Sequence, residues 1–98
     1  MPGYRFTNEA LKDLEEVWSY TNQKWSLEQA DRYYNLIIEE IEFIASNPLS
    51  GRSIDFIKEG YRSAKVKSHI VFYKQQEDNK ILIVRILHQR MDCENRMK

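Results

Sequence analysis

Two long apolar runs in the C-terminal half constrain the fold of this chain more than any other feature. Ile70–Tyr73 and Ile81–Leu87 consist almost entirely of β-branched, aliphatic and aromatic residues. Such runs are typical of central strands, which are covered on both faces of a sheet. Residues 76–79 between them form a polar segment of hairpin length. The two runs are therefore predicted to be neighbouring antiparallel strands.

A third strand is predicted immediately upstream. Tyr61–Lys67 alternates less cleanly between apolar and polar residues, and Ser68 marks a turn onto the next strand. Residues 49–59 are expected to form a loop or irregular turn that leads to this sheet. The chain before Gly60 is then expected to cover one face of three consecutive antiparallel strands.

The first half of the chain predicts one short strand and two amphipathic helices. Tyr4–Phe6 alternates as a short strand does, and Thr7 is a good N-cap for a helix over residues 8–24. Ser26–Gln29 forms a capping box that starts a second helix, and Asn47-Pro48 ends it. Helices joined by so short a connection form an antiparallel hairpin. The aromatic residues on the helix stripes, expected to lie mostly in the core, are Trp18, Trp25, Tyr33 and Tyr34.

The predicted order is β-α-α-β-β-β, an α+β fold in which a helical hairpin packs on a small antiparallel sheet. Its 98 residues are expected to form one domain, 1–98, with no room for a second. No apolar run approaches the roughly 20 residues of a membrane helix, and no secretory signal is recognised at the start. The single cysteine, Cys93, allows no internal disulfide and fits a cytoplasmic location.

The net charge of zero conceals a difference between the two halves of the chain. Residues 1–49 carry 4 Lys/Arg against 9 Asp/Glu, and residues 50–98 carry 11 against 6. An acidic helical side and a basic sheet side are therefore expected. The basic side suits an acidic protein or a nucleic acid, but both sides can equally be solvated faces without a partner.

Several segments spread along the chain resemble one family. They are Asn47-Pro48, Gly51-Arg52, Gly60–Arg62, His69–Tyr73 and Arg85–Asp92, together with the helical spacing of Tyr34, Ile37 and Ile41. The chain resembles the ParE branch of the RelE/ParE toxins of type II toxin–antitoxin modules. This resemblance implies a toxin that inhibits DNA gyrase by protein–protein contact and that a ParD-like antitoxin neutralises. It implies no catalytic residue and no cofactor, and it suggests a role in plasmid stabilisation. From the residues themselves we expect no metal site, no direct nucleic-acid contact and no association with a membrane.

The alternative is a ribosome-dependent messenger RNA endoribonuclease of the RelE branch. That chemistry needs basic residues at the scissile phosphate and a general base. Members of the RelE branch commonly place an arginine after the histidine of the third strand, and a His-Tyr or a tyrosine near the end. Here Ile70 and Gln89-Arg90 occupy those positions, which favours ParE. A small nucleic-acid-binding module is a third possibility, but no aromatic residues interleave with the basic strand positions.

Candidate site residues fall into three groups. The tail from Gln89 is polar and basic, so we expect Arg90, Met91 and Arg96 to contact the target, and we expect truncation of Glu94–Lys98 to spare the fold. Lys65 and Lys67, taken to share one strand face, and Tyr73 are expected to meet the antitoxin. The family-motif residues interpreted as structural are Gly51, Arg52, Arg62, His69, Arg85, His88 and Asp92.

Two points remain open among these motif residues. His69 and His88 could form an acid/base pair at neighbouring strand ends, but we favour hydrogen-bonded structural residues. Arg62 and Arg85 could contact a target, or could pair with a carboxylate such as Asp55 or Asp92. Two histidines and one cysteine fall short of a structural zinc site.

Overall fold

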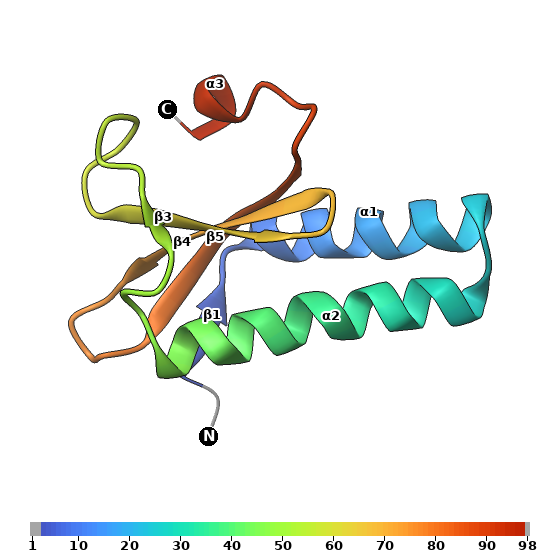
Figure 1. Cartoon of the computed structure of the whole chain (residues 1–98), viewed down its shortest axis with the longest axis horizontal. Coiled ribbons are helices and arrows are strands. Elements are labelled where there is room, and N and C mark those ends of the chain that lie inside the picture. Colours follow the sequence, from blue (N-terminus) through green and yellow to red (C-terminus); the bar gives the residue numbers. More distant parts are fainter. Residues whose placement is uncertain (1–2, 98) are drawn as a thin grey trace.

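A helical hairpin packs against one face of a five-stranded sheet (Figure 1). The structure is a computed structural model, and it describes residues 3–97. The elements in chain order are β1 (Tyr4–Phe6), α1 (Asn8–Lys24), α2 (Leu27–Ser46), β2 (Arg52–Ser53), β3 (Tyr61–Val66), β4 (His69–Gln75), β5 (Ile81–His88) and α3 (Cys93–Met97). The predicted α+β class and helical hairpin are confirmed.

Both long helices begin at the predicted caps. The Thr7 hydroxyl accepts a hydrogen bond from the Ala10 amide at 3.0 Å, and Ser26 Oγ accepts one from Gln29 at 3.1 Å. The Thr7 hydroxyl also donates to the Val84 carbonyl at 2.8 Å. This second bond fixes the start of α1 against β5.

The sheet order is β1-β5-β4-β3-β2. The β3–β4–β5 meander is antiparallel, as predicted, but β1 runs parallel to β5, with Tyr4 opposite Ile81. The sheet is therefore mixed rather than purely antiparallel, because the helical hairpin carries the chain over the sheet between β1 and the meander. The two-residue strand β2 was not predicted, since a segment so short leaves no periodic pattern.

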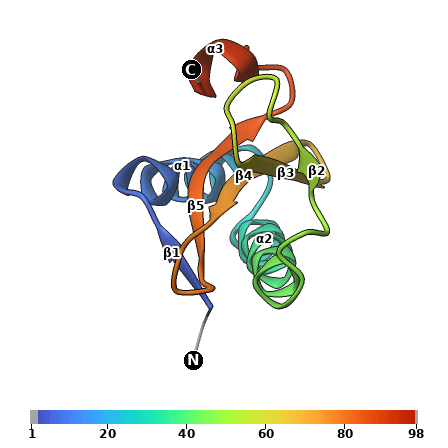
Figure 2. The same cartoon turned by 90° about the vertical axis from the view of Figure 1, so that its left-hand side faces the viewer.

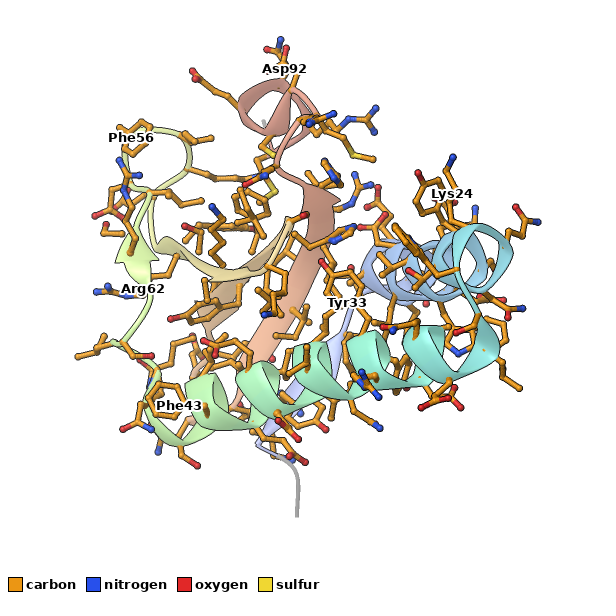
Figure 3. All side chains as sticks on the ribbon, turned by 45° about the vertical axis from the view of Figure 1, so that its right-hand side comes forward. Lys24, Tyr33, Phe43, Phe56, Arg62 and Asp92 are labelled. Carbon is orange, nitrogen blue, oxygen red and sulfur yellow. The ribbon has the colours of Figure 1, made fainter. Side chains whose placement is uncertain are left out.

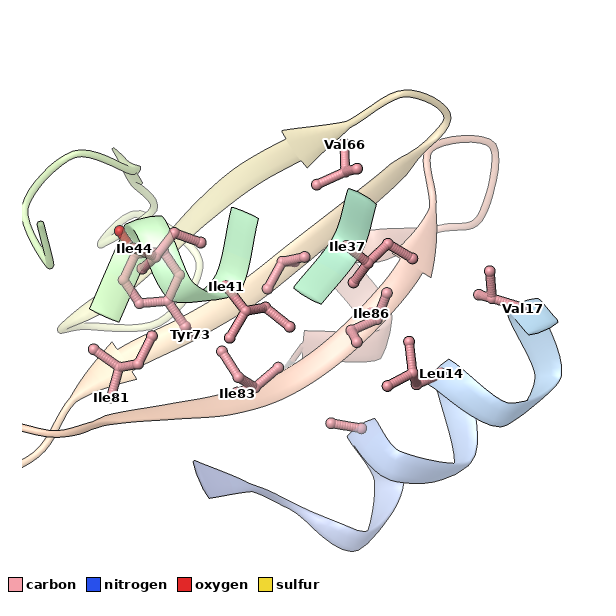
Figure 4. Packing of buried hydrophobic residues seen from close by; sticks show 12 residues of the cluster. Leu14, Val17, Ile37, Ile41, Ile44, Val66, Tyr73, Ile81, Ile83 and Ile86 are labelled. Atoms are coloured by element: carbon pink, nitrogen blue, oxygen red, sulfur yellow. The ribbon is translucent and has the colours of Figure 1, made fainter. Parts of the chain in front are cut away.

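A main core lies between the hairpin and the sheet (Figure 4). Its largest fully buried side chains include Ile37, Ile41 and Ile44 of α2, which belong to the same cluster as Ile83 of β5. Spacings of three and four residues place the α2 isoleucines on one face, as an amphipathic helix requires. The main core is thus the one predicted from the helix stripes and the strand runs.

A second, smaller core covers the opposite face of the sheet. It joins Ile54 from the loop before β3 to Phe72, Leu87 and Met97 of α3. Figure 2 shows α3 and this loop on the side of the sheet away from α2. The expectation of one covered face was wrong, because the loop and the tail each supply apolar side chains to the other face.

The helical hairpin extends beyond the sheet at its α1–α2 connection (Figure 1). Trp25, at this end, is 75% exposed, and Tyr34 on α2 is also exposed. The prediction that the stripe aromatics lie mostly in the core was therefore wrong for these two residues, because the apolar stripe is longer and wider than the sheet that covers it. Within residues 3–97, no helix is both long enough and apolar enough to cross a membrane.

Candidate functional site

The Gly51 turn is tied to the sheet by a buried tyrosine. The Tyr73 hydroxyl donates to the Pro48 carbonyl at 2.9 Å and accepts from the Gly51 amide at 2.9 Å. Burial raises the pKa of Tyr73, which keeps this hydroxyl protonated. Tyr73 is 0% exposed, so its predicted contact with an antitoxin is wrong, because its side chain lies inside the core.

Gly51 is required at this turn for space rather than for an unusual backbone angle. A Cβ atom there would overlap the Tyr73 hydroxyl and lie 2.9 Å from the Ser63 carbonyl oxygen. Arg62 closes the same turn, because its Nη1 donates to the Gly51 carbonyl at 2.8 Å. Arg62 therefore contacts a backbone carbonyl rather than Asp55, while Arg52 is exposed in β2.

A half-buried arginine on β5 forms the main ion pair between sheet and hairpin. Arg85 donates to both carboxylate oxygens of Asp13 in α1, from Nε at 2.8 Å and from Nη2 at 2.9 Å. The hydrogen bonds to Asp13 raise the pKa of Arg85. Arg85 thus pairs with a carboxylate, but with Asp13 instead of the suggested Asp55 or Asp92.

Asp13 is a buried carboxylate that was not among the candidate residues predicted from the sequence. It also accepts from the Ile86 amide at 3.0 Å. A β-bulge between β4 and β5 leaves Val84 without a cross-strand partner. The next residue, Arg85, is paired with Phe72. The spacing of Asp13 from Ala10 and Val17 matches the buried face of α1, and this signal could have identified it.

His69, the first residue of β4, lies opposite His88, the last residue of β5. Their rings lie edge to face with centroids 5.1 Å apart. His69 Nδ1 lies 2.6 Å from the hydroxyl of Tyr33, a residue of α2, and this hydroxyl accepts from the Ser68 amide at 3.2 Å. His88 Nδ1 accepts from the Arg90 amide at 3.1 Å. These contacts fit a hydrogen-bonded cluster that joins α2, the β3–β4 turn and the tail.

Protonation of His69 is unfavourable in this cluster. Burial, the larger cause, and the proximity of His88 together lower its pKa to about 4. His69 is therefore neutral at pH 7, and its Nδ1 can accept the Tyr33 hydroxyl hydrogen. The Tyr33 hydroxyl was missed by the sequence analysis, which treated this side chain only as apolar.

The C-terminal tail is held against the sheet. Met97 of α3 is 3% exposed and packs with Ile54 and Leu87 in the second core. Asp92 caps α3 through the Asn95 amide, 3.4 Å away, and lies at the start of α3 (Figure 3). The expectation that the tail is too polar to contribute to the core was therefore wrong, because Met97 lies in the second core. The burial of Met97 argues against the expectation that deleting Glu94–Lys98 spares the fold, and the effect of this deletion stays a prediction. Lys98 lies outside the described residues.

The tail nevertheless presents side chains to solvent. Arg90 and Arg96 are exposed, and Met91 is 43% exposed. Met91 is also part of a recess of about 280 Å³ between α1 and the end of β5, which we call the α1–β5 recess. The other side chains that line this recess are Asp13, Glu16, Val17, Tyr20, His69, Ile86 and His88.

A separate groove of about 450 Å³ lies between the end of the helical hairpin and the β3–β4 turn. We call it the hairpin-end groove; its lining includes Trp25, Arg32, Tyr33, Leu36 and Lys67. Lys67 belongs to the turn, with φ of 56°, so it does not share a strand face with Lys65 as predicted. Lys65 lies nearby on β3, whose residues after Ser63 have no β2 partner and form an open edge in the described chain.

Residues 3–97 contain no cluster of three or more His, Cys, Asp or Glu side chains that could hold a metal ion. Cys93 is half-buried, and burial raises the pKa of its thiol.

Comparison with known proteins gives consistent matches over almost the whole chain. The family model described as "ParE toxin of type II toxin-antitoxin system, parDE" matches residues 4–93. Toxin ParE1 of Mycobacterium tuberculosis (strain H37Rv) is 37% identical over 94 residues, which cover 96% of each chain. Toxin ParE1 of Caulobacter vibrioides is 37% identical over 93 residues, 95% of each. Toxin ParE of Escherichia coli is 30% identical over 97 residues, 99% of this chain and 94% of that protein.

A solved structure described as "Chromosomal ParDE TA system from P. aeruginosa" has a similar fold. It superposes with a TM-score of 0.73 at 20% identity, over 87% of this chain and 92% of that chain. At this identity the match supports the fold alone.

Proposed function

The chain belongs to the ParE toxins of type II toxin–antitoxin systems, and we propose that it inhibits DNA gyrase in the cytoplasm by protein–protein contact. A ParD-like antitoxin is proposed to neutralise it. The observation that carries the proposed mode of action is the anchored tail, in which Met97 is buried while Arg90, Met91 and Arg96 remain exposed. An anchored basic segment with an exposed methionine suits docking on another protein, because little ordering entropy is lost on binding.

The test is inhibition of gyrase supercoiling by purified toxin. Combined replacement of Arg90 and Met91 by alanine is expected to raise the toxin concentration for half-inhibition about tenfold or more, as loss of an interface hot spot does. Arg52→Ala is the control, because it removes an exposed arginine far along the chain from the tail. Equal inhibition by the double variant would place the contact elsewhere, and no inhibition by the parent protein would reject gyrase as the target.

The proposed antitoxin site is the hairpin-end groove with the adjoining edge of β3. The groove combines apolar surface from Trp25 and Leu36 with the cations Arg32 and Lys67. Arg32 contacts Glu28 at 3.4 Å in an exposed pair that contributes little stability, so it can exchange partners. Lys65 adds a cation at the open edge. An acidic segment with apolar anchors fits this surface, and an antitoxin that folds on binding can supply one.

The toxin is proposed to act without catalysis. His69 Nδ1 is occupied by the Tyr33 hydroxyl, and Ile70 packs against the second core, where it cannot hold a phosphate. Primer extension on translated messenger RNA after induction is the measurement, and no site-specific cleavage is expected. Cleavage that disappears in Arg90→Ala would favour the RelE-type ribonuclease instead.

A further inference from the structure

The α1–β5 recess is distinct from the groove assigned above to the antitoxin, since the two share no lining residue. It is lined by α1 on one side and by the start of β4 and the end of β5 on the other. Val17 and Ile86 make its floor apolar, and Tyr20, His69 and His88 contribute three aromatic rings. Met91, at the start of the tail, closes one side.

The charged side chains that line the recess are carboxylates. Asp13 is already compensated, because both of its oxygens accept from Arg85. Glu16 is exposed and forms no ion pair within residues 3–97. No lysine or arginine lines the recess in this described part of the chain. Glu16 contributes to raising the pKa of Arg85, but only as a charge beyond ion-pair distance. One carboxylate without a direct partner therefore lies beside an apolar and aromatic hollow.

We propose that the α1–β5 recess is a socket for an arginine side chain of the protein that the toxin inhibits. The methylene groups of arginine pack on Val17, Ile86 and Met91, and the planar guanidinium stacks on the aromatic rings. Glu16 accepts hydrogen bonds from the guanidinium edge. The identity of this partner rests on the proposed function, whereas the chemistry of the socket does not.

Arginine fits this recess better than other occupants. A purely apolar side chain would leave Glu16 desolvated without a partner, and an acidic side chain would be repelled by it. Lysine offers a compact, strongly hydrated charge that stacks poorly on the rings, while arginine is planar and more weakly hydrated. An acidic antitoxin segment belongs instead in the hairpin-end groove, whose lining charges are Arg32 and Lys67.

The first experiment uses N-acetyl-arginine amide as the probe and follows the ring protons of His69 and His88 by NMR. Saturable shifts of both rings are expected. N-acetyl-citrulline amide, which has the same shape without charge, is expected to bind several-fold more weakly, and so is the lysine probe. Glu16→Gln should weaken arginine binding about threefold to fivefold, as for a solvent-exposed ion pair. Tyr20→Leu should weaken it by a similar factor through loss of ring stacking.

Glu39→Gln is the matched control, because it removes an exposed carboxylate from α2, away from the recess. Binding that is unchanged in Glu16→Gln, or equal for arginine and citrulline probes, would overturn the socket whatever the target is. In the second experiment, Glu16→Lys should relieve gyrase inhibition at least tenfold relative to Glu39→Lys, since repulsion replaces attraction. Unchanged inhibition would overturn the assignment of the socket to the target, and failure of the parent protein to inhibit would reject gyrase without affecting the probe result.

Discussion

At the scale of single residues, the fold changes the pKa of His69 in the Tyr33–His69–His88 cluster by a large amount. The surroundings of His69 disfavour its protonated form, because one ring nitrogen is already in contact with a hydroxyl group and a second imidazole ring lies close by. Tyr33 lies against Nδ1, and the His88 ring is 5.1 Å away. Glu16 and Asp13 line the same recess but do not offset the burial, since the pKa of His69 still falls to about 4.

The lowered pKa of His69 predicts a loss of stability in acid. The unfolded state binds a proton near the ordinary pKa of about 6.5, while the folded state does not until about pH 4. The contribution of His69 is therefore fully present above pH 6.5 and is lost as the pH falls towards 4. Because His69 is only half-buried, we expect a loss of about 1–2 kcal/mol in the free energy of unfolding.

Urea unfolding of the parent protein and of His69→Gln between pH 7 and pH 4 measures this contribution. Glutamine can still accept the Tyr33 hydrogen bond but does not titrate, so the stability difference between the two proteins should shrink on acidification. His88→Gln serves as the comparison at the partner ring. A difference that stays constant over this pH range would contradict the burial argument.

At the scale of elements, the short helix α3 determines where the tail lies. Its five residues are too few for a stable isolated helix, so tertiary contacts must hold it in place. Met97 supplies these contacts, together with the Asp92 cap. The exposed residues of the tail therefore have a fixed position relative to the sheet.

Met97→Ala is expected to lower the free energy of unfolding by about 2 kcal/mol, because it leaves a cavity in the second core. Met91→Ala, at a half-exposed position of the same tail, should change it by less than about 0.5 kcal/mol. Thermal or urea unfolding of the two variants gives the comparison. Equal stability of both would mean that α3 contributes nothing to the fold.

The helices and strands that are indicated by residue patterns within a short stretch of sequence were predicted correctly. The two helix caps, the hairpin and the β3–β5 meander depend on residues near one another in sequence, such as Thr7 and Ser26. The parallel pairing of β1 with β5, the burial of Met97 and the Asp13–Arg85 pair depend on contacts between distant segments. The β1–β5 pairing and the burial of Met97 leave no periodic signal, because a three-residue strand and a single methionine look the same in sequence whatever they contact. The helical spacing of Asp13 indicates its burial, but the sequence does not indicate that Arg85 is its partner.

At the scale of the whole molecule, ion pairs connect the acidic helical hairpin to the basic half that contains the sheet, while other charged side chains of the two halves lie on different surfaces. Arg85 links them through Asp13, with a longer contact to Glu9 at 3.8 Å. Arg5 of β1 forms a second link between the two halves of the chain, with Asp78. Away from these pairs, Glu16 lies beside the tail and Lys67 lies at the hairpin-end groove. This separation allows one small domain to present chemically different surfaces to two partners.

The separation predicts that the two proposed activities can be lost independently. Replacing Lys65 and Lys67 by glutamate should weaken binding of the antitoxin about tenfold or more, because an acidic segment would meet like charges. The same variant should still inhibit gyrase, since neither lysine lies in the tail or lines the α1–β5 recess. The Arg90 and Met91 double-alanine variant should show the reverse pattern. Combined replacement of Lys12 and Lys58 by glutamate makes the same change in net charge at two exposed positions outside the recess and the groove, and it serves as the control. Titration of the antitoxin by calorimetry and a supercoiling assay on the same preparations measure both activities. Loss of both activities in either variant, with the fold intact by circular dichroism, would show that the two partners share one surface and would reject the separation.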